Sequence, residues 1–334
     1  AHRLVADRGV SEIADYGRPL FRQTIRVHIE NGEEKGEERS VQYEMSDRKQ
    51  ALKSGSRVVV NKNETPDEIN YYVSDVYRLN HLWVLVALFA ALSAIFGRGK
   101  GIMAFFGLGF SLFVVYVFIL PHIIAGHNPF LICLIGAILI ACVSLYLAHG
   151  VNRQTTIALA ATLASILLAL GLSEFFVSFT KLFGLGTEEA FYLQYAPIPN
   201  ISLQGLLLGG IIIGTLGILD DITTAQTAAV AEIYRANESL SVRELYRRGT
   251  AVGREHIASL VNTLVLAYTG AAFPLLLLFT IYEKPIWVTM NSELVMEEII
   301  RTLVGSTTLI LAVPITTLLA AFFVRRKKDH PPKI

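Results

Sequence analysis

The sequence predicts an α-helical polytopic membrane protein of about seven transmembrane helices, with a small N-terminal extracytoplasmic β-domain. Of its 334 residues, 53% are hydrophobic and only 17% are charged, whereas about a quarter of the residues in a typical soluble domain are charged. Long apolar runs recur from residue 82 onward, and runs of about 18 residues or more are typical of membrane spans. Shorter alternating runs with turn signals precede them and indicate strands.

The first 76 residues divide into a polar segment, 1–19, and a β-rich domain, 20–76. The polar segment mixes charges without a clear period. From Gln23 to Glu30 apolar and polar residues alternate, and the hairpin signal Asn31-Gly32 follows. Further strands are expected at 40–44, 57–60 and 69–76, with turns at Ser54-Gly55 and Thr65-Pro66-Asp67. We therefore expect four short strands in a compact barrel, near the lower size limit for a self-sufficient core.

Seven apolar runs make up the predicted membrane domain, 77–324. They are residues 82–96, 102–121, 130–148, 157–179, 201–219, 257–282 and 299–324. The first run is short for a helix of about 20 residues that crosses a bilayer, unless its flanks or a thin bilayer compensate. Pro274 and Pro314 lie within two later runs and are expected to kink them. Residues 325–334 are expected to form a basic cytoplasmic tail.

The distribution of basic residues predicts the orientation in the membrane. One set of loops and ends contains most of the Lys and Arg residues, namely Arg98, Lys100, Arg153, Arg235, Arg243, Arg247, Arg248, Arg254, Arg325, Arg326, Lys327 and Lys328. The opposite set contains Lys181, Lys284 and Arg301. The positive-inside rule places the first set in the cytoplasm, which puts the β-domain outside and the C-terminus inside.

Composition and missing motifs exclude several other classes. The formal net charge is +1, so the overall charge does not indicate nucleic-acid binding. Cys133 and Cys142 lie in one apolar run, too far apart on a helix to bridge each other. The sequence has no phosphate loop, G-x-S-x-G elbow, H-E-x-x-H pair or dinucleotide glycine pattern. Soluble catalytic machinery is therefore not encoded, and the sequence does not indicate a cofactor.

Polar residues concentrate between Gly205 and Asn262, where two apolar runs adjoin. The segment begins with glycines in small-xxx-small steps, at Gly205, Gly209, Gly210, Gly214 and Gly217. Such steps let helices pack closely in lipid, or let backbone carbonyls line an ion path. The apolar run ends at Asp220-Asp221. We interpret 220–256 as an amphipathic and basic cytoplasmic hairpin that could fold back over the mouth between the two spans.

Two interpretations of Asp220-Asp221 stay open. In the first, the two residues only cap helices, with Thr223-x-x-Gln226 as a capping box. In the second, the carboxylate pair binds a cation or carries protons at the cytoplasmic mouth, and its mutual repulsion needs a cation or an Arg nearby. Glu232 shares a helix face with Asp221 and could extend this acidic track or pair with a base. Gln226 belongs to the same candidate site.

The second apolar run begins with further candidates. Arg254 could supply the counter-charge, and His256 could be a proton or ligand partner or a structural residue at a helix start. Asn262 lies deeper and needs a hydrogen-bond partner in the membrane. Asp220, Asp221 and His256 are also suitable ligands for a divalent metal, although their spacing matches no fixed metal motif.

Three more residues are candidates from other segments. His149 and Asn152 lie in a loop on the same predicted side of the membrane, where they join the cluster or merely close a short turn. Glu174 is the one acid well inside a predicted span, and it either snorkels to the surface or forms the outer step of an ion path.

Several motifs resemble the YibE/F-like family of bacterial membrane proteins. They are G-T-L-G-I-L-D-D at 214–221 with Gln226, Val230, Glu232 and R-A-N at 235–237, G-R-E-H-I-A-S at 253–259 with N-T-L at 262–264 and L-A-Y at 266–268, G-R-G-K-G at 97–101, and H-G-x-N at 149–152. The resemblance covers the chain from about residue 20, and Glu238 and Phe273 depart from the family pattern. It implies a further N-terminal span before Ala1, but no activity.

Three functions follow as hypotheses. The first is a transporter or channel for a small ion or solute in a bacterial cytoplasmic membrane, in which Asp221→Asn abolishes pH-dependent flux. The second is an intramembrane metal-dependent enzyme on a lipid-linked substrate, whose metal is lost in Asp220→Ala or His256→Ala. The third is a non-catalytic scaffold whose β-domain docks an envelope protein and which fails when residues 1–76 are deleted. The expected partners are the lipid bilayer and a second copy or an envelope protein, but not nucleic acid.

Overall fold

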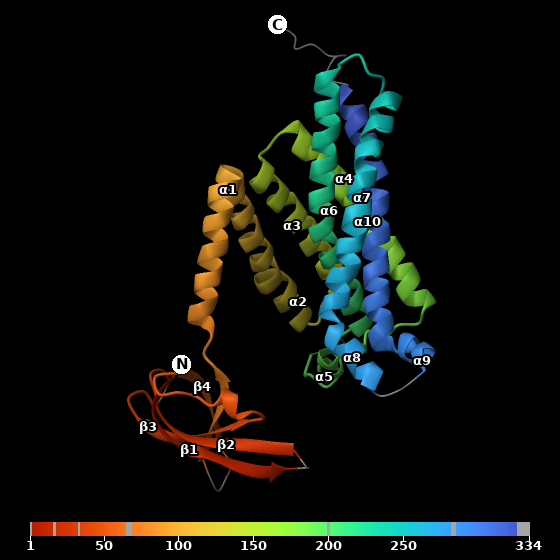
Figure 1. Cartoon of the computed structure of the whole chain (residues 1–334). Helices are drawn as coiled ribbons and strands as arrows, with labels where there is room; N and C mark the ends of the chain where they lie inside the picture. The colour runs from red at the N-terminus through yellow and green to blue at the C-terminus, as the bar shows by residue number, and fades with distance from the viewer. Residues whose placement is uncertain are drawn as a thin grey trace. The chain divides into compact units, whose positions relative to one another are not determined.

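The computed structural model describes residues 2–15, 18–32, 34–64, 69–198, 201–281 and 285–325. The strands are β1 (His2–Asp15), β2 (Arg18–His28), β3 (Glu38–Met45), β4 (Arg57–Glu64) and β5 (Ile69–Val76). The helices are α1 (Leu79–Phe113), a π-helical segment (Val114–Ile119), α2 (Leu120–Ile124), α3 (Pro129–His149), α4 (Arg153–Phe179), α5 (Glu188–Gln194), α6 (Leu203–Ala236), α7 (Val242–Ala271), α8 (Phe273–Ile281), α9 (Ile286–Asn291) and α10 (Glu293–Arg325), with a short 3-10 turn at Arg48–Gln50. Figure 1 shows these elements along the chain.

The chain divides into two compact units, Ala1–Leu92 and Ser93–Ile334, and the boundary falls inside α1. The predicted turn Thr65-Pro66-Asp67, the predicted loop residue Lys284 and the basic tail beyond Arg325 lie outside the described residues.

The first unit contains a closed five-stranded barrel with the order β1-β2-β3-β5-β4. All its strand pairs are antiparallel except β3 with β5, a Greek-key arrangement like that of OB-fold barrels. The alternation predicted for residues 23–30 places Ile25, Val27 and Ile29 inside, where each is at most 6% exposed. The buried amide of Gln23 bonds both the N–H and the carbonyl of Leu52, which closes the loop between β3 and β4 over the core.

Strand β1 differs from the sequence prediction, which assigned residues 1–19 to a polar segment and counted four strands. The structure forms a fifth strand there, and it pairs with β2 along most of its length. The register shifts between Leu4 and Ala6 and again between Asp7 and Val10. A strand whose register shifts twice is not expected to show a simple alternation in its sequence.

The second unit is helical. In it, α6 packs against α3, α4, α7 and α10, and these helices lie side by side in Figure 1. The largest apolar cluster joins Ile212, Leu216, Leu219 and Ile222 of α6 to residues of α3, α4 and α10. Buried alanines, such as Ala137 of α3 and Ala312 of α10, bring the helices close together.

Among the described residues, five helical stretches are long and apolar enough to cross a membrane, or six if the bent pair α7 and α8 counts as one span. The first stretch is Leu79–Ile124, which contains a sharp break at Arg98, where φ is 52° and ψ is −141°. At this break a Cβ on Gly101 would collide with the carbonyl oxygen of Ser93, so only glycine allows the close approach. The chain is therefore compatible with a multi-pass membrane protein.

Candidate functional site

Helix α6 runs without interruption through Asp220 and Asp221. It begins after Ser202, whose hydroxyl accepts from the Gly205 N–H, and it ends at Ala236. The capping interpretation of the two Asp residues is therefore wrong, because neither lies at a helix end. The helix continues past them because residues at helical spacing, Ile222, Thr223, Gln226, Thr227 and Val230, are fully buried against its neighbours.

Helix α7 is equally continuous. Its N-cap is Ser241, whose hydroxyl accepts from the Glu244 N–H. The basic part of the predicted hairpin is the first part of this helix, and the two helices are joined by residues 237–241. Segment 220–256 therefore forms a helical hairpin that consists of the second part of α6, this loop and the first part of α7.

Gln226 connects three helices inside the unit. Its amide nitrogen donates to the Gly249 carbonyl of α7 at 2.8 Å and to the Thr317 hydroxyl of α10 at 2.7 Å. The side chain is fully buried, and its Oε1 has no hydrogen-bond partner among the described residues. Gly253 lies directly against this amide. The sequence pointed to Gln226 as a site residue, and the structure gives it a role in helix packing.

The glycines of α6 serve different purposes. A Cβ at Gly209 would meet the Cys133 side chain, with 2.8 Å to its Cβ, so α3 and α6 approach closely there. A Cβ at Gly205 would lie 3.6 Å from the backbone nitrogen of Phe130, and a Cβ at Gly214 would face the Tyr268 hydroxyl. By contrast, nothing lies within 4 Å of a Cβ at Gly210 or Gly217. The close helix approach therefore involves only part of the glycine pattern.

Asp220 and Asp221 line a cavity of about 420 Å³, which we call the Asp cavity. Most of its wall is apolar and comes from α1, the π-helical segment, α3 and α6, with Leu108, Ile140 and Leu216 among the lining residues. The Oδ1 atom of Asp220 is buried and has no hydrogen-bond partner among the described residues. Asp221 is more exposed. A carboxylate oxygen left without a partner in an apolar wall is costly, and it is therefore the strongest sign of a functional group in the site.

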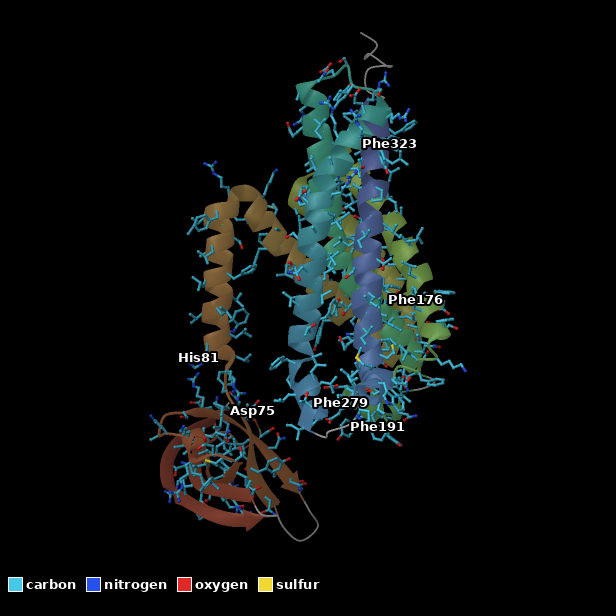
Figure 2. All side chains as sticks on the ribbon, turned by 45° about the vertical axis from the view of Figure 1, so that its right-hand side comes forward. Asp75, His81, Phe176, Phe191, Phe279 and Phe323 are labelled. Atoms are coloured by element: carbon cyan, nitrogen blue, oxygen red, sulfur yellow. The ribbon has the colours of Figure 1, made fainter. Side chains whose placement is uncertain are left out.

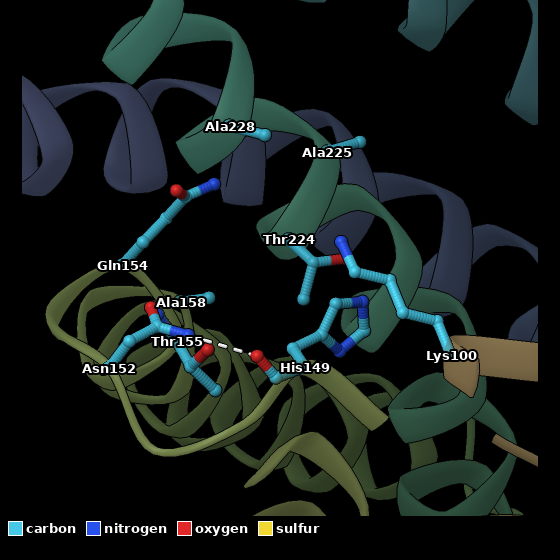
Figure 3. Close-up of a pocket in the computed structure, with 9 residues that line it drawn as sticks. All are labelled: Lys100, His149, Asn152, Gln154, Thr155, Ala158, Thr224, Ala225 and Ala228. Atoms are coloured by element: carbon cyan, nitrogen blue, oxygen red, sulfur yellow. Dashed lines mark hydrogen bonds between the residues drawn. The ribbon is translucent and has the colours of Figure 1, made fainter. Parts of the chain in front are cut away.

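A second cavity of about 340 Å³, the Lys100 cavity, adjoins the first and shares His149 with it. Figure 3 shows Lys100 reaching into it from α1, with Gln154 on the opposite side and Thr224 of α6 between them. Asn152, Thr155, Ala158, Ala225 and Ala228 complete the lining.

Asn152 has a clear structural role at this cavity. Its Oδ1 accepts from the Thr155 N–H at 2.9 Å, and its Nδ2 donates to the carbonyls of His149 and Gly150. Asn152 therefore caps α4 and closes the α3–α4 turn, which was one of its two predicted roles. The turn in return fixes the backbone of His149, whose ring lines both cavities.

A third cavity of about 530 Å³ shares Asn152 and Gln154 with the Lys100 cavity and reaches Arg235 and Glu238 near the end of α6. Arg153 borders it and donates to the carbonyl of Phe323, which Figure 2 labels near the end of α10. The lining residues of the three cavities thus extend along α6 from Ile213 to Arg235, with Glu238 just beyond its end. Asp220 lines the Asp cavity, and Thr224, one turn further along α6, lines the Lys100 cavity.

The remaining predicted residues do not gather at Asp220. Glu232 forms an ion pair with Arg235 on the surface of α6. Arg254 makes no ion pair with either Asp among the described residues, and Asn262 and Glu174 are exposed on their helices. His256 is half-buried on α7, and its Nδ1 is without a partner in the described part of the chain. The counter-charge predicted for Arg254 is therefore not seen.

The structure gives no support to a metal centre built from these side chains. Within the described ranges, no group of three or more His, Cys, Asp and Glu residues is placed to hold a metal ion. Asp220, Asp221 and His256, the predicted ligands, do not form such a group.

One residue of the site was missed at the sequence level. Lys100 counted only as a loop charge, because its contribution depends on the break at Arg98.

Two acids of α10, which do not line the three cavities, were also missed. Glu297 is only 3% exposed and accepts from the Gly186 N–H at 2.9 Å, while Glu293 accepts from the N–H groups of Phe183 and Leu185. Both acids lie just before an apolar run, at positions where no sequence pattern indicates burial.

These features are compatible with a multi-pass helical membrane protein that has a buried carboxyl oxygen on the wall of a cavity. Residues 85–326, more than half of the chain, match the family described as YibE/F-like protein, and the chain belongs to this family. The match does not include the barrel, although the sequence resemblance was expected to extend from about residue 20. No curated protein and no solved structure matches the chain.

Proposed function

We propose that the protein is a transporter or channel for a small ion or solute. The supporting observation is the buried, unpartnered Oδ1 of Asp220 on the wall of the Asp cavity. A carboxylate in such a place is a default candidate for binding a cation or a proton along a membrane path. In this proposal the Lys100 cavity and the third cavity, which share lining residues, would form a route to it from the end of α6.

Further polar groups lie within the helix bundle. The hydroxyls of Thr162 and Thr223 lie 2.8 Å apart between α4 and α6. One turn further along α4, the buried Ser165 hydroxyl has no partner in the described residues, and neither has the Thr308 hydroxyl of α10. Unpartnered buried hydroxyls are typical places for ordered water, which favours a polar route past Asp220 rather than a sealed apolar core.

The proposed topology has seven spans. The break at Arg98 divides the stretch Leu79–Ile124 into two arms, each of which is about 28 Å or more in length at 1.5 Å per residue. The bent pair α7 and α8 forms one further span. With the barrel outside and the C-terminus inside, the turns at Arg98 and Asn152 and the α6–α7 loop all lie in the cytoplasm, in agreement with their basic residues. A bacterial cytoplasmic membrane is the proposed location.

Replacement of the carboxylate tests the proposal. The purified full chain is reconstituted into liposomes that hold a pH-sensitive dye, and the decay of an imposed pH gradient is followed. We expect Asp220→Asn to slow the decay by about tenfold or more, because the amide cannot exchange a proton. Asp221→Asn, at the more exposed position, should have the smaller effect.

Glu232→Gln provides the control, because this acid lies on the same helix but pairs with Arg235 at the surface. Its proton flux should equal that of the wild type. Wild-type flux in the Asp220→Asn protein, or no flux in the wild type, would contradict the proposal.

A further inference from the structure

We infer that the Lys100 cavity binds an oxyanion, the phosphate or carboxylate group of a small solute or of a lipid headgroup. The inference deepens the proposed function and rests on it in one respect: the bound group is taken to belong to the species that passes Asp220. The binding itself is tested independently of transport.

The first argument is the set of side chains that converge there. Lys100 supplies a positive charge, and Gln154 and His149 supply N–H groups on different sides of the same cavity (Figure 3). The Thr224 hydroxyl lines the cavity too, but it donates to the backbone carbonyls of Asp220 and Asp221. Neither Lys100 nor Gln154 makes a side-chain hydrogen bond or ion pair in the described part of the chain. Donors that point into a shared space without partners suit a ligand that offers several acceptors at once.

The second argument is the sign of the lining. Among the described residues that line the cavity there is a Lys but no Asp or Glu. A cation bound there would meet the Lys100 charge with only amide, hydroxyl and ring acceptors to offset it, so repulsion would dominate. An anion bound there would be attracted by the Lys100 charge, and no acidic side chain of the lining would repel it.

The third argument is the backbone on one wall. Asn152, Gln154 and Thr155 are the cap and first turn of α4, and all three line the cavity. The positive end of the helix dipole favours an anion at this position, whereas the Thr155 N–H is already bonded to the Asn152 cap. The dipole therefore adds to the charge of Lys100 instead of opposing it.

The position of Lys100 also depends on a special backbone. It lies between two glycines and directly after the break at Arg98, which has a positive φ of 52°. This turn presents the lysine to α4 and α6, as Figure 3 shows. The volume of about 340 Å³ suits a small solute or a headgroup rather than a large molecule.

Asp221 is the main opposing group. It lines the neighbouring Asp cavity and interacts electrostatically with His149, the residue that the two cavities share. Its charge should weaken anion binding without preventing it. The effect of Asp221→Asn on affinity therefore distinguishes the two kinds of ligand. The substitution should strengthen the binding of an anion, whereas it would weaken the binding of a cation.

The binding test uses inorganic phosphate as the probe and the purified full chain in neutral detergent. Calorimetric titration measures the dissociation constant for the wild type, Lys100→Met, Lys100→Arg and Asp221→Asn. We expect Lys100→Met to weaken binding by about tenfold or more, which is the loss of one charge-assisted contact. Lys100→Arg should bind within a few-fold of the wild type, and Asp221→Asn should bind more tightly.

The matched control is Arg243→Met, which removes an exposed cation of α7 that does not line the cavity. It should leave the phosphate affinity unchanged. Each variant should elute as a monodisperse peak with an unchanged unfolding midpoint in the absence of phosphate, so a lost affinity cannot be attributed to misfolding.

A parallel arm distinguishes the two sources of the oxyanion. Native mass spectrometry compares the retention of phosphatidylglycerol and phosphatidylcholine by the wild type and by Lys100→Met. Phosphate binding that depends on Lys100 supports a soluble anion, and selective retention of phosphatidylglycerol that depends on Lys100 supports a headgroup. If neither probe binds, or if Lys100→Met and Arg243→Met behave alike, the inference is wrong.

The outcome is separable from that of the proposed function. Loss of proton flux in Asp220→Asn, together with unchanged phosphate binding in Lys100→Met, would support the transport function and contradict the oxyanion site. Phosphate binding that depends on Lys100, in a protein that shows no proton flux, would support the anion site and contradict the transport function.

Discussion

Gly253 is the position at which the packing of α7 can be tested most directly. A Cβ there would collide with the Cγ1 of Val313 on α10, and it would lie 3.0 Å from Oε1 and 3.2 Å from Nε2 of Gln226. Neither neighbour can move freely: Val313 is fully buried, and two hydrogen bonds hold the Gln226 amide. The substitution Gly253→Ala must therefore push α7 away from α10.

The expected cost follows from two opposing effects. Overpacking a close contact costs about 1–3 kcal/mol, and replacing Gly by Ala in a helix returns up to about 1 kcal/mol. The net destabilisation should be about 1–2 kcal/mol, which lowers a heat-unfolding midpoint by roughly 2–8 °C for a unit of this size.

Gly217→Ala is the matched control, because nothing lies within 4 Å of a Cβ at this position of α6. It should leave the midpoint unchanged or raise it slightly. The assay heats detergent-solubilised protein in steps and measures the fraction that still elutes as a monodisperse peak. Equal midpoints for Gly253→Ala and Gly217→Ala would refute the packing between α7 and α10.

Three further predictions concern the barrel, the α4 cap and the buried amide. Hydrogen bonds from Tyr71 and Lys62 lower the pKa of Glu34 from 4.5 to about 2, so its contribution to barrel stability is complete above pH 4.5 and is lost as the pH falls toward 2. Hydrogen exchange of barrel peptides in the full chain, corrected for the intrinsic effect of pH, should show this loss, and Glu34→Gln should remove it. Asn152→Ala should destabilise the protein by about 1 kcal/mol, and Asn152→Ser should restore most of it; equal heat midpoints for the two variants would contradict the capping role. Gln226→Leu removes the two hydrogen bonds that the amide donates to α7 and α10 and should cost about 1–3 kcal/mol in the same assay. A midpoint unchanged from the wild type would show that this amide does not connect the helices.

The elements that could be predicted from sequence are those with an uninterrupted period. Strand β2 has Ile25 and Val27 on its buried face as expected. The described parts of the long apolar runs are helical except at Ile201, Ser202 and Ala272. Strand β1 could not be predicted because two bulges break its alternation. The failure is local, since the rest of the barrel follows the pattern.

The site was harder to predict because charge was taken as the end of a helix. Asp220-Asp221 closes an apolar run, yet α6 continues beyond it. The helix continues because Thr223, Gln226 and Val230, which recur at helical spacing, are buried against neighbouring helices. The hydrophobic pattern of the run was visible, but the buried polar face beyond it required the positions of α4, α7 and α10. The position of Lys100 at the cavity depends in the same way on the backbone break at Arg98, which the sequence composition does not predict.

The continuity of α6 also decides which of the two carboxylates matters. Consecutive residues on a helix point about 100° apart, so the two acids of one continuous helix cannot occupy the same environment. Asp220 has a buried oxygen without a partner, whereas Asp221 is more exposed and interacts electrostatically with His149. As caps of two separate helices, the pair would have been interchangeable, and Asp221→Asn would have been the natural test. On one helix the two should separate, with Asp220→Asn acting on flux and Asp221→Asn acting mainly on the affinity of the Lys100 cavity.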